Sequence, residues 1–244
     1  MRHLILTRSA YGPGWSLEAN RRRLDMTCAV TVRSLASQTS RDFRWLVLLH
    51  PADPLLRERM AAYGSIGAEF LYLDASGTSA EVAWQAYRAG WADAIGTRED
   101  TVAMTRLDDD DAFAPWAMAR VQERTTKIDR RTALMFPIGV RVWAGRYTLV
   151  RHSSNAMHTL VTPPGDTLTV YDYGHRDVRK HMPVRSVDPR PAWLWSRHLD
   201  TISGWRIAER PLTPQIRAMF NVDWSLFGEP RSQARAPRAG RVFR

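Results

Sequence analysis

The first 110 residues or so alternate between short apolar runs and segments with apolar side chains at helical spacing. The apolar runs cover residues 3–7, 43–49, 68–73 and 102–107. Continuous apolar runs of this length are typical of strands that are buried on both faces. Strands that alternate with helices form a parallel sheet with right-handed crossovers. We therefore predict an α/β, Rossmann-like fold with a mainly parallel sheet flanked by helices.

Three segments between these runs have the spacing of helices. Residues 20–38 and 55–64 are two of them. In the third, Trp84, Tyr87, Trp91 and Ile95 recur every three or four residues, which places them on one helical face. We interpret this aromatic stripe as core packing against the sheet.

The second half of the chain has a different pattern. Residues 132–136, 140–143, 147–150 and 168–171 read as short strands, and the middle two form an antiparallel pair that turns at Ala144 and Gly145. Beyond residue 171 the chain is rich in His, Arg, Pro and Trp and has few periodic segments. We expect an irregular, mixed α/β second half.

The net charge of +10 depends strongly on the end of the chain. Residues 231–244 contain five arginines and no acidic side chain. Without them the net charge falls to about +5, which is no signal for nucleic acid. We predict that this basic tail docks on an acidic surface of a protein partner or a polyanion.

Neither a membrane span nor a secretory signal is expected. The longest apolar runs, such as residues 45–49, are too short to cross a bilayer, and the first residues lack the features of a signal peptide. These features favour a cytoplasmic protein without a transmembrane segment. A single cysteine, Cys28, excludes an internal disulfide and a multi-cysteine zinc site.

Four consecutive carboxylates, at residues 108–111, directly follow the fourth predicted strand. Packing like charges together costs free energy through repulsion and desolvation, a cost that a divalent cation would offset. Mg²⁺ and Mn²⁺ are held by one or two carboxylates together with substrate phosphates. The alternative is a solvated acidic loop that caps a helix beginning near Pro115. Arg8 and Asp74 also follow predicted strands, at the edge where open α/β sheets bind ligands.

Three blocks of the sequence resemble the rhamnosyltransferase group of GT-A-type glycosyltransferases, which is similar to glycosyltransferase family 2. Residues 33–49 match a pattern of Ser-Leu, Gln-Thr and Phe-x-Trp. Residues 105–112 match an Arg-Leu-Asp-x-Asp-Asp metal motif. Looser similarity covers His175 and the Trp-x-x-x-x-His spacing from Trp193 to His198. Where the family usually continues with a small residue and Asn, this chain has Leu199 and Asp200.

The resemblance implies an inverting, metal-dependent transfer of a hexosyl group from a nucleotide-sugar donor to a hydroxyl of a carbohydrate or glycosylated acceptor. It implies one domain over residues 1–230, with a donor half (1–114) and an acceptor half (115–230). The implied donor-binding residues are Thr7, Arg8, Asp74, Arg106 and Asp108. The implied ligands of Mn²⁺ or Mg²⁺ are Asp108, Asp110 and Asp111, with His175 or His198. Candidates for the general base are Asp172, Asp177 and Asp200; Asp200 is preferred because it lies closest to the Trp–His segment.

Several alternatives remain open on the sequence alone. Asp110 is the expected direct ligand, but spacing does not decide between adjacent carboxylates. Arg106 could equally be an ordinary strand residue whose charged head reaches solvent. The whole chain could be a nucleotidyltransferase, or a non-catalytic carbohydrate-binding component anchored by its basic tail.

Overall fold

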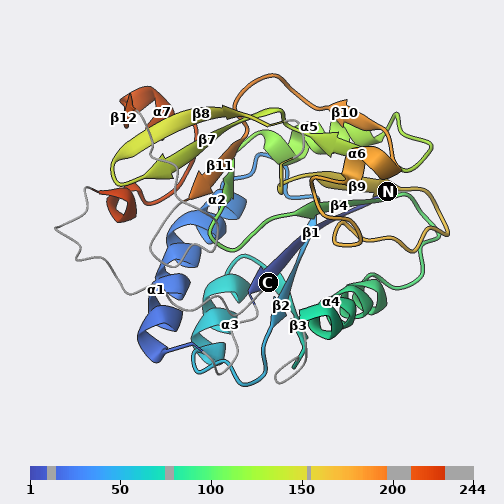
Figure 1. Ribbon diagram of the computed structural model, residues 1–244, viewed down its shortest axis with the longest axis horizontal. Coiled ribbons are helices and arrows are strands. Elements are labelled where there is room, and N and C mark those ends of the chain that lie inside the picture. Colours follow the sequence, from blue (N-terminus) through green and yellow to red (C-terminus); the bar gives the residue numbers. More distant parts are fainter. Residues whose placement is uncertain (10–14, 75–79, 153–154, 197–209, 229–244) are drawn as a thin grey trace.

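The computed structural model describes residues 1–9, 15–74, 80–152, 155–196 and 210–228. In this part, β-strands form a seven-stranded and a five-stranded sheet (Figure 1). The basic tail lies outside the described residues, so its docking role stays a prediction.

The seven-stranded sheet has the order β10-β6-β9-β4-β1-β2-β3. Its parallel part consists of β1 (Arg2–Ser9), β2 (Arg44–Leu49), β3 (Ala68–Tyr72) and β4 (Val102–Arg106). β9 (Thr159–Thr162) runs antiparallel between β4 and β6 (Thr132–Met135), and β10 (Val184–Ser186) pairs with β6. The parallel sheet predicted from the sequence is thus confirmed, and strands from the second half extend it.

The five-stranded sheet has the order β12-β8-β7-β11-β5. Its strands are β5 (Ala112–Phe113), β7 (Ile138–Trp143), β8 (Arg146–Arg151), β11 (Trp193–Ser196) and β12 (Arg210–Pro211). The predicted antiparallel pair is β7 and β8, and Ala144 and Gly145 turn it with positive φ values of 48° and 70°. Two successive positive φ values suit the right-handed twist of a tight hairpin.

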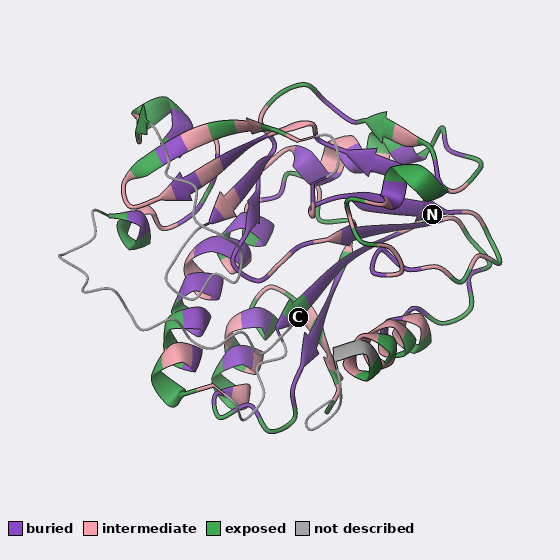
Figure 2. Cartoon of the chain, in the orientation of Figure 1, coloured by how far each residue is buried: buried purple, intermediate pink, exposed green. Residues whose placement is uncertain are grey.

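Helices cover both faces of the seven-stranded sheet. The bounds are α1 (Leu17–Thr27), a π-helical turn (Cys28–Val32), α2 (Arg33–Ala36), α3 (Leu56–Gly64), α4 (Ala80–Ile95), α5 (Ala117–Thr125), α6 (Val178–His181), α7 (Pro214–Ala218) and a 3₁₀ turn (Trp224–Phe227). One apolar core contains side chains of α1, α2, α3 and α5, and another contains those of α4 and α6. Figure 1 shows α3 and α4 on opposite sides of β1, β2 and β3. In Figure 2, β1 and β2 are largely buried, whereas the edge strand β3 is intermediate to exposed.

Alternation along β1 divides its side chains between the two cores. Ile5 packs in the core with α1 and α3, whereas Leu4 and Leu6 pack in the core with α4. Successive side chains of a strand point to opposite faces. Residues 7 and 9 therefore continue the face of Ile5, and Arg8 continues the face of Leu6.

The predicted strand over residues 168–171 is wrong. Side chains, rather than a neighbouring strand, bond its backbone: Asp166 accepts from the Leu168 N–H at 3.0 Å and Asp172 accepts from the Thr169 N–H. A further backbone bond, from Asp172 N–H to Thr169 C=O, closes a turn. Asp and Thr favour such local bonds, which compete with strand pairing. The apolar residues of this segment still face the core, where Tyr171 is buried.

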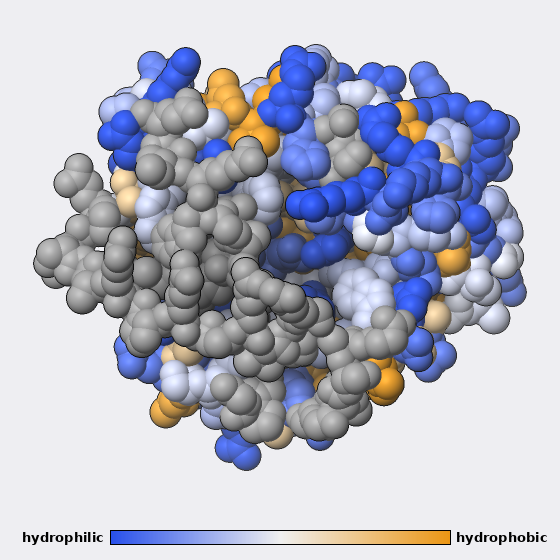
Figure 3. All heavy atoms as spheres, in the orientation of Figure 1, coloured by the Kyte–Doolittle hydropathy of each residue, from blue (hydrophilic) through white to orange (hydrophobic). Residues whose placement is uncertain are grey.

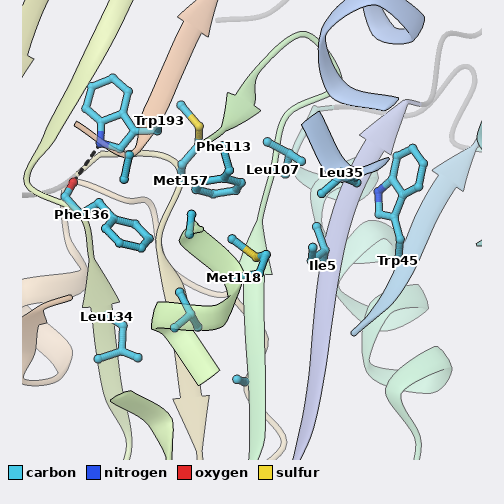
Figure 4. Close-up of a cluster of buried hydrophobic side chains, with 14 of the residues drawn as sticks. Ile5, Leu35, Trp45, Leu107, Phe113, Met118, Leu134, Phe136, Met157 and Trp193 are labelled. Atoms are coloured by element: carbon cyan, nitrogen blue, oxygen red, sulfur yellow. Dashed lines mark hydrogen bonds between the residues drawn. The ribbon is translucent and has the colours of Figure 1, made fainter. Parts of the chain in front are cut away.

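Gly139 on β7 is pressed against the indole of Trp193, its partner on β11. A Cβ at position 139 would lie 2.0 Å from that ring, whose Nε1–H donates to the Phe136 carbonyl at 2.9 Å (Figure 4). We expect Gly139→Ala to lower the free energy of unfolding by about 3 kcal/mol, because the buried ring has to move. Urea denaturation would measure this.

The matched control is Gly90→Ala, where an added Cβ has no neighbour within 4 Å. Gly90 lies inside α4, so alanine should raise the free energy of unfolding by roughly 0.5–1 kcal/mol. Equal effects at the two positions would contradict the packing of Trp193 on Gly139.

In the described part of the chain, every helix is too short or too polar to cross a membrane.

Candidate functional site

The carboxyl ends of the four parallel strands place polar residues along one edge of the sheet. Arg8 and Ser9 end β1, His50 follows β2, and Asp74 lies two residues beyond β3. The acidic cluster, which we define as residues 108–111, follows β4. In the view of Figure 3, strongly hydrophilic side chains gather near the centre of the molecular surface. This edge is the candidate site.

The first residue of the acidic cluster faces outward and pairs with an arginine of the preceding strand. Arg106 contacts Asp108 with two nitrogens, at 3.0 and 3.1 Å. The side chain of Asp108 is 36% exposed and that of Arg106 is 18% exposed. The neighbouring charge of Asp108 favours the protonated guanidinium and raises the pKa of Arg106 despite burial, which lowers it. Arg106 and Asp108 therefore present one polar surface at the end of β4.

The second residue, Asp109, is 1% exposed and belongs to the interior. Its Oδ2 accepts from the Ser9 hydroxyl at 2.8 Å, and its Oδ1 accepts from Arg23 Nε at 3.1 Å. The same guanidinium donates from Nη1 to Asp110 Oδ2 at 2.8 Å. Arg23, on α1, thus joins two adjacent carboxylates.

The last residue, Asp111, is also buried, and its Oδ1 accepts from the Ser196 N–H at 3.0 Å. Thr31, in the π-helical turn, donates to the Asp111 carbonyl at 2.9 Å. Burial, followed by repulsion from Asp110 and Asp108, raises the pKa of the Asp111 carboxyl well above its ordinary value. The cluster therefore holds a carboxylate whose negative charge is unfavourable in the structure as it stands.

Aromatic rings support the two arginines at the ends of β1 and β4. The guanidinium of Arg8 lies 5.9 Å from the ring centroid of Trp84 and 5.5 Å from that of Tyr87. That of Arg106 lies 5.2 Å from the ring of Tyr171, which contacts Trp84 edge-on at 5.9 Å. A cation over an aromatic face is held electrostatically. These contacts fix two positive groups beside the acidic cluster.

The aromatic stripe of α4 therefore has two roles. Trp91 and Ile95 are buried, as predicted for core packing. Trp84 and Tyr87 are only half-buried and support Arg8.

Asp74 is held by a histidine from the neighbouring strand. His50 Nδ1 accepts from the Ala52 N–H at 3.0 Å, so its Nε2 carries the proton and donates to Asp74 Oδ1, 3.0 Å away. The Asp74 side chain is 57% exposed. It is thus oriented and still accessible to a ligand.

The structure gives the other predicted residues different surroundings. Thr7 is fully buried and its hydroxyl accepts from Trp45 Nε1 at 2.9 Å, so its side chain faces the core; its role in donor binding stays a prediction. Asp172 accepts from the Thr169 hydroxyl at 2.8 Å and lies 3.8 Å from Arg88. Its role as general base stays a prediction. His198 and Asp200 lie outside the described residues.

His175 lies near the acidic cluster. It is half-buried, and its pKa is lowered by burial and by Arg106, and raised by Asp108. The ring of His152 is 6.4 Å from that of His175. His175 therefore stays a candidate for contact with a ligand at Asp108.

The chemistry of the acidic cluster suits a hard divalent cation. Its donors are carboxylate oxygens, and the raised pKa of Asp111 shows that positive charge would be favourable there. Among the described residues, no three His, Cys, Asp or Glu side chains are arranged to hold a metal ion together. Asp108, Asp110 and Asp111 therefore do not form a closed ligand set. One or two carboxylates, with the rest of the shell from water and donor phosphates, would fit Mg²⁺ or Mn²⁺.

Sequence reasoning missed four residues of the site: Ser9, Arg23, Tyr171 and Ser196. Ser9 could have been found, because it continues the strand whose end was already a candidate. Arg23 lies in a run of three arginines, residues 21–23, only one of which reaches the acidic cluster. Nothing in the sequence distinguishes that one without the helix orientation.

Comparison with known proteins identifies the family of this chain. Residues 16–210 match the family described as "Putative rhamnosyl transferase". The chain belongs to this family. The match includes Arg23, Asp74 and the whole acidic cluster, and it ends before the basic tail. No curated protein matches the sequence.

Solved structures show which fold this family member has. Residues 1–349 of S. aureus TarS, in complex with UDP, match with a TM-score of 0.50 and 12% identity. The match covers 81% of this chain and 61% of the TarS chain, so this family member spans less than two thirds of that relative. At such identity the likeness shows the fold, which is that of GT-A glycosyltransferases.

Two other structures match with TM-scores of 0.41. A nucleotide-diphospho-sugar transferase structure from Desulfovibrio desulfuricans shares 14% identity, over 80% of this chain and 82% of its own. A glucose-1-phosphate thymidylyltransferase structure from Bacillus anthracis shares 12%, over 79% of this chain and 88% of its own.

Proposed function

We propose that the protein transfers a hexosyl group from a nucleotide-sugar donor to a hydroxyl of a carbohydrate or glycosylated acceptor, with the help of Mn²⁺ or Mg²⁺. One observation carries the proposal: the acidic cluster of a rhamnosyltransferase-family chain lies at the carboxyl edge of a GT-A parallel sheet, with Asp111 buried at a raised pKa. Ligands of open α/β sheets bind at this edge.

The residues around the acidic cluster have separate roles in this proposal. Asp110 binds the cation, with Asp108 beside it; the bound cation would neutralise charge on the leaving diphosphate. Arg8, held over Trp84 and Tyr87, and the exposed carboxylate of Asp74 bind the nucleotide part of the donor. The contact of Arg106 with Asp108 orients that carboxylate.

The acceptor side needs a general base, because the attacking hydroxyl loses a proton as the new bond forms. Asp172 is bonded to Thr169 and close to Arg88, so its carboxylate already has partners. We assign the base to Asp200, which lies two residues after His198, the end of the Trp-x-x-x-x-His spacing, and within the family match of residues 16–210. An inverting outcome follows if this base activates the acceptor directly.

A thermal-shift experiment tests the cation and donor site. We expect Mn²⁺ together with one of UDP, GDP or dTDP to raise the Tm by several degrees, because ligands that bind only the folded state stabilise it. At 100 times the Kd, the gain is about 2.7 kcal/mol. Asp110→Asn should abolish this gain.

The control is Asp129→Asn, an exposed acid before β6, at the opposite edge of the sheet. It should keep the full gain. If no combination of Mn²⁺ with these nucleotides raises the Tm of the wild-type protein, the transferase proposal is wrong and the carbohydrate-binding alternative is favoured.

A further inference from the structure

Arg23 is the residue through which α1 reaches the acidic cluster, and the proposed roles of donor and acceptor residues do not use it. We propose that Arg23 is a positioning residue: it holds Asp109 as a structural carboxylate and fixes Asp110 in the orientation that binds the cation. The inference rests on the proposed function, because it concerns how the same cation site is prepared.

The geometry separates the two carboxylates that Arg23 contacts. Asp109 is 1% exposed and receives Arg23 Nε on one oxygen and the Ser9 hydroxyl on the other. The Asp110 side chain is 11% exposed and receives Arg23 Nη1 at 2.8 Å. Asp109 is therefore bonded on both oxygens inside the protein, whereas Asp110 lies nearer the surface of the same motif.

The anchor behind Asp109 is itself rigid. Ser9 Oγ lies 3.2 Å from the Tyr63 hydroxyl, and Tyr63 accepts from Arg59 Nη1 at 3.2 Å. Arg59 is fully buried and pairs with Asp53, which is also buried, at 2.6 Å. This chain of bonds connects α3, the end of β1 and the acidic cluster. The position of Arg23 is thus determined by the protein interior and not by a ligand.

Arginine suits this bridge better than lysine, because Nε and Nη1 of Arg23 reach different carboxylates. Its planar guanidinium has donors on three nitrogens in a fixed fork, so one side chain can bond two carboxylates at once. A lysine at position 23 keeps the charge but offers a single nitrogen. Fixing the Asp110 carboxylate before the cation arrives removes part of the ordering cost of binding.

Calorimetric titration with Mn²⁺ alone tests the role. Arg23→Lys should weaken Mn²⁺ binding about tenfold, since it loses charge-assisted hydrogen bonds that hold Asp110. Ser9→Ala changes no charge and loosens Asp109, so a smaller loss, roughly threefold, is expected from the same principle. The control Arg22→Lys changes the neighbouring arginine, which pairs with Glu18 on the helix surface, and should bind Mn²⁺ like the wild type.

A second measurement separates positioning from direct contact with the donor. At saturating Mn²⁺, the affinity of Arg23→Lys for whichever of UDP, GDP and dTDP binds the wild type should be unchanged. A tenfold loss in this measurement would overturn the inference, because Arg23 would then contact the diphosphate itself.

Other outcomes separate failure of the inference from failure of the proposed function. Wild-type affinity for Mn²⁺ in folded Arg23→Lys, verified by circular dichroism, overturns the inference and leaves the proposed function intact. If Arg23→Lys does not fold, the Mn²⁺ affinity of Ser9→Ala is the test. Unchanged Mn²⁺ affinity in Ser9→Ala would also overturn the inference. A wild-type protein that binds no Mn²⁺, with or without nucleotide, overturns the proposed function together with the inference.

Discussion

Two buried histidines are expected to contribute a loss of roughly 2–3 kcal/mol in the free energy of unfolding when the pH falls from 6 to 5. His3 and His158 are 4% and 2% exposed. Burial lowers the pKa of His3 to about 4. Burial and then the charges of Arg106 and His175 lower the pKa of His158 to about 3. Both stay neutral in the folded protein at pH 5, whereas in the unfolded chain they are protonated below about pH 6.5.

The sign follows from which state binds more protons. Between pH 6.5 and 4 the unfolded state binds a proton at each histidine and the folded state does not, so stability falls as the pH falls. Each such proton changes the free energy of unfolding by about 1.4 kcal/mol per pH unit. Ionised acids with lowered pKa values, such as Asp166 and Glu69, lose their contribution only at lower pH. The Asp111 carboxyl, whose pKa is raised, acts in the opposite direction, so the histidine contribution is measured as the difference between a histidine variant and the wild type.

The variant His3→Gln checks this origin. His3 Nδ1 accepts from the Gln122 amide at 3.2 Å, so Nε2 donates to the Thr105 hydroxyl at 2.8 Å, a bond that a glutamine amide can replace. Urea denaturation at pH 7, 6 and 5 should give a slope smaller by about 1.4 kcal/mol per pH unit below pH 6. The exposed His181→Gln is the control. A wild-type slope in His3→Gln would be evidence against the buried neutral histidine.

The parallel half of the fold was predictable because its signal is local. Each strand of β1–β4 has a mainly apolar centre, and the helices between them have their own periodicity, so the alternation of strands and helices, and with it a parallel sheet, follows from local signals. In contrast, β9 lies between β4 and β6 only because residues about 55 apart pair, as in Thr105 with Thr159. The four residues of β9 contain no sequence signal that predicts which strands they pair with.

The site was predictable as a place and less so residue by residue. Arg8, Asp74 and Asp108 were predicted to lie together because strand ends of a parallel sheet share one edge, and the structure has them at that edge; their contact with a donor stays a prediction. Thr7 was assigned with Arg8, although adjacent strand residues face opposite sides, and Thr7 faces the core.

Arg23 shows the other limit of sequence reasoning. Its bonds to Asp109 and Asp110 span 86 and 87 residues. Which of the four adjacent carboxylates are bonded inside the protein therefore cannot be predicted without the structure.

Asparagine at position 111 is expected to make the cation-free protein more stable. The Asp111 carboxylate is buried near Asp108 and Asp110, which raises its pKa, so its ionisation at neutral pH costs folding free energy. Asparagine keeps an oxygen for the Ser196 N–H and removes the charge. We expect a gain of about 1–3 kcal/mol at pH 7.5, or a rise in Tm of several degrees.

The pH dependence identifies the cause. A carboxyl with a raised folded pKa contributes stability at low pH, and this contribution is lost as the pH rises through that pKa. The Tm difference between Asp111→Asn and the wild type should therefore grow from pH 4.5 to pH 8. The matched control is the same substitution at another buried member of the acidic cluster, Asp109→Asn. It weakens the acceptor for Arg23 and Ser9 and should therefore lower the Tm.

The same substitution should also reduce the response to cation. In the wild-type protein a divalent cation bound as proposed would offset the repulsion among the carboxylates, so Mn²⁺ should raise its stability. In Asp111→Asn much of that repulsion is already gone. Scanning calorimetry with and without Mn²⁺ should thus show a higher starting Tm and a smaller gain. A lower Tm than wild type without cation at pH 7.5 would mean that the Asp111 charge is compensated within the protein. A buried carboxylate whose ionisation is unfavourable without a ligand supports the proposed cation site over a solvated helix-capping loop, in which Asp111 would be exposed.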